Sequence, residues 1–274
     1  MEKITDKIYV ETEYLGNNVG VIITREGLVL IESPMLSADA RHWKEAIRKV
    51  TDKKFAYLIS THHHFDHVIG NCHFDCPAIA HKNAIGGFEY LKTHLREEFE
   101  RFFPEDRDQW EADVPNLKVV MPQITFSKEL FLNMGDCVIE LKFVGGHSAS
   151  SVSIYIPSEK TVFAGDNIDN EMHPFLGQAR LSVWIDYLKG ILDMEVDTII
   201  PGHGPVGDKQ IAIKFLKYLE EFMHQVKTLK EAGYSPEEVG GKIDIIDFFP
   251  VDPKERPTVS NLITEGTKVI YAQV

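Results

Sequence analysis

Cysteine is scarce in this chain: three residues, Cys72, Cys76 and Cys137, occur among 274. Their odd number and spacing match neither a disulfide framework nor a C-x-x-C zinc pattern, which predicts free thiols in a reducing compartment. Long apolar runs are also missing, since no stretch of about 18 apolar residues occurs and the polar start lacks the core of a signal peptide. We therefore expect a cytoplasmic protein with no membrane partner.

Positive charge is in short supply as well. The chain has 29 Lys and Arg against 42 Asp and Glu, a formal net charge of -13. Nucleic acids and anionic membranes attract proteins through clustered Lys and Arg. No nucleic-acid partner is expected, and the partner that remains is a small-molecule substrate. Formation of a homo-oligomer is left open.

Short strand-like segments dominate both halves of the chain. KIYVE, VGVIIT and GLVLIES predict an antiparallel meander, and FAYLIS predicts a buried strand. A second β-rich region runs from ITF to TVFAGD, over residues 124–166. Helical patterns begin at Ser37 as N-cap and at residues 84, 181, 209 and 261. Residues 104–115 are acidic and are expected to be irregular. Strands bracketed by helices on both sides predict a layered αββα arrangement.

Four histidines and an aspartate lie within the segment THHHFDH at residues 61–67. In an extended segment, His62 and His64 point to the same side, so that one cation could bind both. Asp66 and His67 diverge and suit a second centre at the start of a short helix. Imidazole and carboxylate are common metal ligands, so this segment predicts a metal site.

Three Gly-rich loops later in the chain each place one polar residue after a β-like run. They are GGHS with His147, AGD with Asp166 and PGHG with His203. Loops at strand ends often carry function. Each loop alone is a weak signal, and their order after the histidine-rich segment makes them further ligand candidates.

Together these segments resemble the metallo-β-lactamase superfamily, over about residues 5–230. The resemblance implies an α/β fold, a four-layer αββα sandwich, in a single domain over residues 1–274. It also implies a helical insert at about 84–114, which could form a lid, and a C-terminal extension at about 234–274. The implied ligands are His62, His64 and His147 for one metal, Asp66, His67 and His203 for the other, and Asp166 for both.

The resemblance further implies an enzyme, a metal-dependent hydrolase. Two divalent ions, with Zn first and Mn or Fe as alternatives, would share a bridging hydroxide, and Asp66 would act as the catalytic proton acceptor. The expected reaction is cleavage of a small-molecule ester, thioester or lactone, with β-lactam hydrolysis at most a side activity. Two alternatives stay open: a phosphodiesterase, and a persulfide dioxygenase with one iron on His62, His147 and Asp166.

Four residues are candidates for substrate binding. Phe103 and Trp110 belong to the insert, where aromatic side chains could form an apolar pocket wall. His173 and Phe175 lie in the loop that follows Asp166 and are expected to line the same pocket.

Overall fold

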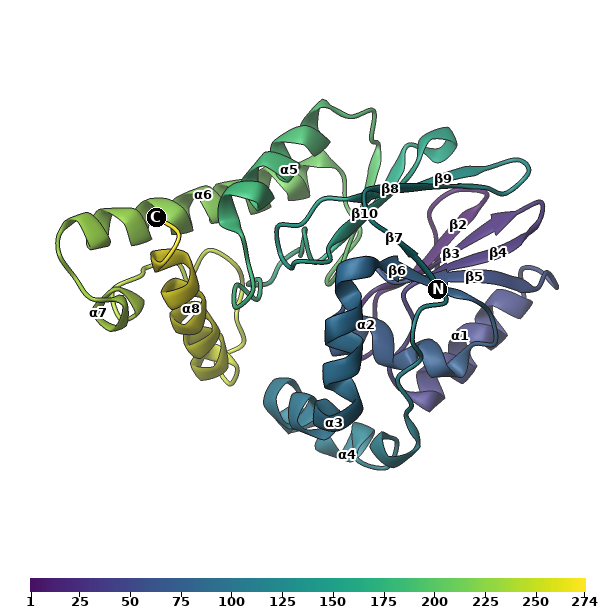
Figure 1. Cartoon of the computed structure of the whole chain (residues 1–274), viewed down its shortest axis with the longest axis horizontal. Helices are drawn as coiled ribbons and strands as arrows, with labels where there is room; N and C mark the ends of the chain where they lie inside the picture. Colours follow the sequence, from purple (N-terminus) through teal and green to yellow (C-terminus); the bar gives the residue numbers. More distant parts are fainter. The chain divides into compact units, whose positions relative to one another are not determined.

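A computed structural model describes residues 1–274, and the chain divides into two compact units (Figure 1). The first unit comprises residues 1–143 and 152–159, and the second comprises residues 144–151 and 160–274. The single domain with an insert at 84–114 and an extension at 234–274 stays a prediction.

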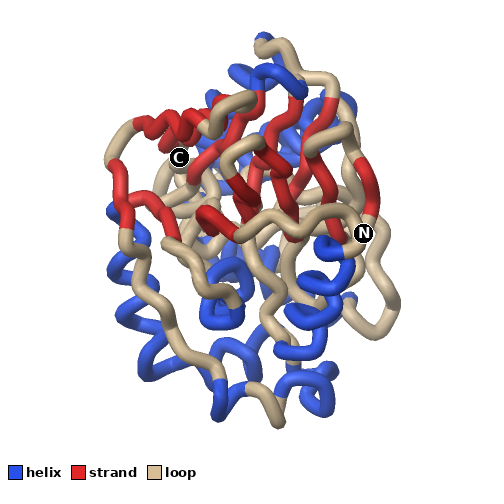
Figure 2. Tube along the Cα trace, turned by 90° about the vertical axis from the view of Figure 1, so that its right-hand side faces the viewer, coloured by secondary structure: helices blue, strands red, loops and turns tan.

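The first unit contains a seven-stranded sheet whose strands lie in chain order, β1 to β7 (Figure 2, red). The strands are β1 (Glu2–Lys3), β2 (Ile8–Glu11), β3 (Val19–Thr24), β4 (Gly27–Ile31), β5 (Phe55–Ile59), β6 (Ala78–His81) and β7 (Ile124–Phe126). The predicted meander is confirmed, because β2, β3 and β4 pair antiparallel. From β4 to β7 all pairs are parallel. The predicted strand ITF is confirmed as β7, and it pairs with β6 at the end of this sheet.

Strands β3 and β4 are buried along nearly their whole length, since their apolar sequences fit a sheet that is covered on both faces. The same unit holds the antiparallel strands β8 (Glu129–Asn133), β9 (Val138–Phe143) and β10 (Val152–Ile156), followed by the 3-10 turn η5 (Pro157–Glu159). In β8, half-buried side chains alternate with exposed ones, the pattern of a strand with one face toward solvent.

The helices of the first unit follow the predicted pattern with two corrections. They are α1 (Ser37–Arg48), α2 (Phe65–Val68), η1 (Ile69–His73), η2 (Lys82–Ala84), α3 (Ile85–Phe102), η3 (Pro104–Asp106), α4 (Arg107–Trp110) and η4 (Val114–Asn116). Ser37 is the first residue of α1 rather than its N-cap, and its backbone N–H donates to Asp113 Oδ2 at 2.6 Å. The segment 104–115 is helical in part, because Trp110 is fully buried and its indole N–H donates to Phe103 O at 2.7 Å.

The second unit contains a parallel strand pair and four helices. These are β11 (Thr161–Gly165), β12 (Thr198–Pro201), α5 (Leu181–Asp193), α6 (Lys209–Glu231), α7 (Pro236–Gly240) and α8 (Arg256–Tyr271). Helix α6 begins where the Asp208 carboxylate accepts the backbone N–H of Gln210, and it ends before Gly233, whose φ is +89°. Trp184 and Phe215 join α5 to α6, with ring centroids 5.7 Å apart.

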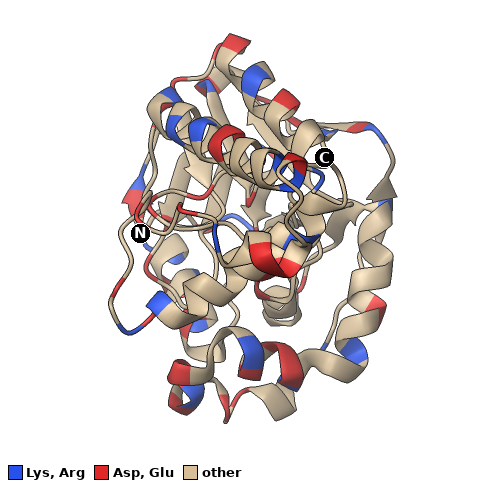
Figure 3. Ribbon diagram, turned by 90° about the vertical axis from the view of Figure 1, so that its left-hand side faces the viewer, with Lys and Arg blue, Asp and Glu red and all other residues tan.

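Charges of both signs alternate along the helices (Figure 3). On α3, for example, Lys92 pairs with Glu89 and Arg96 with Glu100. None of the helices combines the length and apolar character that crossing a bilayer requires.

Candidate metal centre

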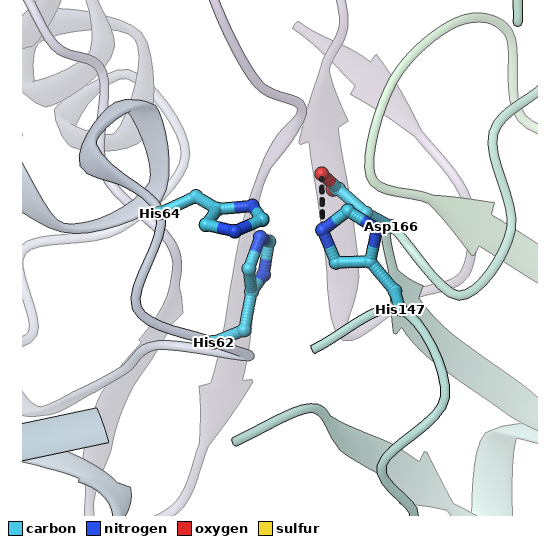
Figure 4. A group of neighbouring side chains, drawn as sticks. All are labelled: His62, His64, His147 and Asp166. Carbon is cyan, nitrogen blue, oxygen red and sulfur yellow. Dashed lines mark ion pairs between the residues drawn. The ribbon is translucent and has the colours of Figure 1, made fainter. Parts of the chain in front are cut away.

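The histidine-rich segment leaves β5 in an extended conformation and turns into α2 at His64, the N-cap of that helix. His62, Asp66 and His67 are buried, and His64 is half-buried. The imidazole rings of His62 and His64 are neighbours, with centroids 4.6 Å apart at 80° (Figure 4). Their spacing of two residues in extended backbone places both rings together, as expected.

Glu32 joins this segment and was missed by the sequence analysis. Its Oε1 accepts the Thr61 backbone N–H at 2.8 Å and lies 3.3 Å from Nδ1 of His67. The possible ligand atoms of Glu32, His62 and His67 all lie within 4.8 Å of one another. The sequence offered one signal for Glu32, because it is the charged residue that ends the otherwise apolar run GLVLIE. The backbone of Glu32 is left-handed, with φ at +58°, a conformation that non-glycine residues seldom adopt and that is often found at functional sites.

Two contacts orient the imidazole rings. Thr61 Oγ1 lies 3.0 Å from His62 Nδ1, so Nε2 would be the ligating nitrogen of His62. Nε2 of His67 lies 3.3 Å from Asp66 Oδ2, which brings the two predicted ligands of one metal together.

Phe65 anchors the ligand-bearing helix α2 in the hydrophobic core. It is buried among Phe99, Phe102 and Phe103, with ring centroids between 5.1 and 5.9 Å from its own. These three phenylalanines belong to the predicted insert. The insert therefore packs on Phe65, the residue between His64 and Asp66.

The second unit brings the other three predicted ligands together. Oδ2 of Asp166 lies 3.5 Å from Nε2 of His147 (Figure 4, dashed) and 3.5 Å from Nε2 of His203. His147 and Asp166 are buried, and His203 is half-buried. Asp169, which the sequence analysis missed, is buried and belongs to a group with Asp166 and His203 whose ligand atoms lie within 4.8 Å. The sequence signal for Asp169 was its place as a second carboxylate in the segment DNID, three residues after Asp166.

Glycine is required in two of the ligand loops. Gly146 has φ at +89°, and a Cβ there would lie 2.8 Å from Asn167 Oδ1, the atom that accepts the backbone N–H of His147. A Cβ on Gly202 would lie 2.0 Å from Asp166 Oδ1. The glycines thus permit the close approach of backbone to the ligand side chains.

Trp184 supports His147 from α5. Its indole N–H donates to Asn167 O at 2.8 Å, and its ring meets the His147 ring edge-on at 5.4 Å. Asn167 therefore links Trp184 to the backbone of His147. No local sequence pattern indicated a role for Asn167 or Trp184.

The four predicted substrate-binding residues lie in different surroundings. Trp110 is fully buried and Phe103 packs on Phe65. His173 is buried, with Nδ1 at 3.1 Å from Tyr218 Oη and Nε2 at 3.0 Å from Ile246 O, and burial lowers its pKa. Phe175 is half-buried, with its ring centroid 6.4 Å from that of His147. The substrate-binding roles stay predictions.

The donor set of both units fits a divalent metal. Buried imidazole nitrogens and carboxylate oxygens within 4.8 Å of one another are the ligands that Zn, Mn and Fe accept. Burying carboxylates and imidazoles this close together is costly unless they are paired or hold a cation.

Comparison with known proteins agrees with this donor set. The profile of the Metallo-beta-lactamase superfamily matches residues 13–203. The chain is 23% identical over 240 residues to a metallo-beta-lactamase type 2 of Elizabethkingia meningoseptica, covering 83% of this chain and 87% of the relative. It is 25% identical over 193 residues to the human acyl-coenzyme A thioesterase MBLAC2, covering 67% of this chain and 68% of the relative.

Solved structures share the fold. A metallo-beta-lactamase from Pontibacter korlensis superposes with a TM-score of 0.61 at 20% identity, covering 80% of this chain and 97% of that one. A double mutant of the sec-alkyl sulfatase PisA1 superposes with a TM-score of 0.76 at 15% identity. That match covers 99% of this chain, which spans 49% of the sulfatase chain.

These findings confirm three predictions: the metallo-β-lactamase type of α/β fold, a metal-binding protein, and an enzyme that is a metal-dependent hydrolase. Since the superfamily profile matches well over half of the residues, the chain belongs to the metallo-β-lactamase superfamily.

Proposed function

We propose that this protein is a dinuclear metallohydrolase that cleaves a small-molecule ester, thioester or lactone. The observation that carries the proposal is the position of Asp166, one oxygen of which lies 3.5 Å from Nε2 of both His147 and His203. Each unit also gathers acids and imidazoles: the possible ligand atoms of Glu32, His62 and His67 lie within 4.8 Å of one another, and so do those of Asp166, Asp169 and His203. Glu32 and Asp169 lie beside the proposed ligands and are not assigned to a metal.

The proposed ligand assignment follows the superfamily pattern. His62, His64 and His147 would hold one metal, Asp66, His67 and His203 would hold the second, and Asp166 would be shared by both. The position of Asp166 supports the bridging role, because one of its oxygens lies 3.5 Å from the Nε2 atoms of both His147 and His203. Those two imidazoles are assigned to different metals. Zn is the first candidate for both positions, with Mn or Fe as alternatives.

Two divalent cations in these positions would supply a water that is deprotonated near neutral pH and would polarise the carbonyl oxygen under attack. The chain's own groups perform the remaining work. Asp66 accepts the proton of the attacking water and passes it to the leaving group. Its neighbour His67 holds it in place through the contact at 3.3 Å, and Glu32 in turn orients His67.

Thioesters are the first substrates to test, because a relative that covers two thirds of the chain bears the name of an acyl-coenzyme A thioesterase. The net charge of -13 disfavours polyanions, so a thioester of a small neutral or weakly anionic thiol suits the chain better than a coenzyme A thioester does. Phosphodiester cleavage and the one-iron persulfide dioxygenase remain alternatives, and no specific contact in either unit favours them.

The test is elemental analysis of protein purified without added metal, followed by a panel of thioester, ester, lactone, phosphodiester and secondary alkyl sulfate substrates. Two equivalents of Zn, Mn or Fe with turnover of an acyl substrate would support the proposal. One equivalent of iron with oxygen uptake on a persulfide would overturn it. A matched control is His224→Gln, which changes an exposed histidine and is expected to keep both metals.

A further inference from the structure

A cysteine–histidine pair lies in the first unit, apart from the proposed metal ligands. Cys72 and His73 end the 3-10 helix η1, and both side chains are half-buried. The Cys72 Sγ lies 4.0 Å from Nδ1 of His73, and Nε2 of His73 lies 3.1 Å from the backbone oxygen of Met35.

The contact with Met35 decides which nitrogen of His73 is basic. A carbonyl oxygen can only accept a hydrogen bond, so Nε2 carries the proton and donates it. Nδ1 then presents its lone pair to the Cys72 thiol and can take the thiol proton. The product is an imidazolium whose two N–H groups donate to Met35 O and to the thiolate, the arrangement in which histidine activates a cysteine nucleophile.

Further groups around Cys72 favour the thiolate. The backbone of Lys118 lowers the pKa of the Cys72 thiol through a hydrogen bond. The ammonium of Lys44, on α1, donates to the backbone oxygen of His73 and interacts electrostatically with Cys72. Burial raises the pKa of the Cys72 thiol, but the hydrogen bonds from His73 and Lys118, the charge of His73 and a hydrogen bond from its own backbone together lower it overall.

The other two cysteines lack such a partner histidine and behave in the opposite way. Burial and the neighbouring Asp75 carboxylate raise the pKa of the half-buried Cys76 to about 11. Burial also raises the pKa of Cys137. The chain therefore holds two internal controls for Cys72, one of them with the same class of exposure.

We propose that Cys72 and His73 form a thiolate–imidazolium pair and that Cys72 is the residue at which hydroperoxides oxidise this protein. The thiolate attacks one peroxide oxygen, so an S–O bond forms and the O–O bond breaks. Sulfur is oxidised to a sulfenic acid and the peroxide is reduced. The leaving hydroxide, or the alkoxide of an organic hydroperoxide, takes the proton from the His73 imidazolium and departs as water or as the alcohol, which restores the neutral ring.

The test is alkylation of the metal-loaded protein with limiting iodoacetamide between pH 6 and 9, with each cysteine-containing peptide quantified by mass spectrometry. We expect Cys72 to react at least about tenfold faster than Cys76 at pH 7, because each pKa unit changes the thiolate fraction about tenfold well below the pKa. The midpoint of the Cys72 profile should lie below 8.5, the ordinary value for cysteine. A Cys72 profile that coincides with that of Cys76 would overturn the proposal.

Two variants extend the test. His73→Gln keeps a side chain that can donate to Met35 O but cannot take a proton, so the midpoint for Cys72 should move to higher pH; an unchanged midpoint would rule out the pair. Hydrogen peroxide followed by dimedone should label Cys72 in the wild-type protein, and Cys72→Ser should lose that label. Labelling at Cys76 or Cys137 instead would also contradict the proposal. If His73→Gln does not fold, the wild-type pH profile and the Cys72→Ser comparison still decide.

Discussion

Oδ2 of Asp166 lies 3.5 Å from Nε2 of His147, although the two side chains come from loops that follow different strands. An oxygen this close to a buried imidazole is suited to share a cation with it, and the same oxygen is equally close to His203. Asp166 is therefore the side chain in the second unit on which the most contacts of the ligand set converge.

Asp166→Asn should reduce kcat/KM by at least about 100-fold, since even the outer-shell partners of metal ligands are worth about 10- to 100-fold. The amide keeps the shape of the side chain but loses the negative charge that would balance two cations. Metal content and hydrolysis rate, measured on the same preparation, check this result. A variant that keeps both metals and full activity would remove Asp166 from the centre, and His224→Gln is the control at an exposed site.

Glu32→Gln should weaken metal binding by about 10- to 100-fold while the fold stays intact. The glutamine oxygen can still accept the Thr61 N–H at the position of Oε1, but it no longer orients His67 with a negative charge. Competition with a chelator measures the change in affinity. Glu45→Gln on the exposed face of α1 is the matched control, and equal affinities for the two variants would contradict a role for Glu32.

Glu32→Ala tests the structural role of the same residue. Without a carboxylate, the buried Thr61 N–H loses its acceptor, and this loss should lower the free energy of unfolding by about 1–3 kcal/mol. Urea denaturation of the metal-free protein isolates this effect from metal affinity. No change in the midpoint would show that another group accepts the Thr61 N–H.

Phe65→Ala should lower the free energy of unfolding by about 3–5 kcal/mol, the usual cost of removing a buried aromatic side chain. Phe65 packs against Phe99, Phe102 and Phe103, and a cavity there would also loosen α2 with its ligands. The control is Phe131→Ala, since Phe131 is 50% exposed and its loss should cost less than about 0.5 kcal/mol. Similar urea midpoints for the two variants would refute the anchoring role.

Acidification should destabilise the wild-type protein through His173. Burial lowers the pKa of His173 in the folded state, so below its ordinary value of 6.5 the unfolded chain binds more protons than the folded one. The stability contributed by the neutral ring is complete above pH 6.5. It is lost as the pH falls from 6.5 through the lower pKa that His173 has in the folded state. His173→Gln should show a smaller loss of unfolding free energy between pH 8 and pH 5 than the wild type does. An equal loss in both proteins would exclude His173 as the cause, and His224→Gln should behave like the wild type.

Much of the fold could be predicted because its signals are local. The apolar runs of β3, β4 and β11 and the helical periodicity of α5 and α6 each lie within one segment. The partner of β7 could not be predicted because strand pairing joins segments that are far apart in the chain: β7 pairs with β6, which the apolar pattern did not reveal. The start of α1 was displaced by one residue for a similar reason, since the carboxylate of the distant Asp113 accepts the backbone N–H of Ser37 in the first turn.

The ligand candidates and the family could both be read from local patterns in the chain. The HxHxDH spacing and the glycines beside His147, Asp166 and His203 are local requirements of backbone geometry and ligand chemistry. They can therefore be recognised in the sequence. Only the tertiary structure decided that Glu32 lies beside His67, that Asp169 joins Asp166, and that Cys72 and His73 meet a carbonyl and a lysine from other segments. Burial and contact between distant residues depend on how whole elements pack, and packing sums many weak interactions that no short segment contains.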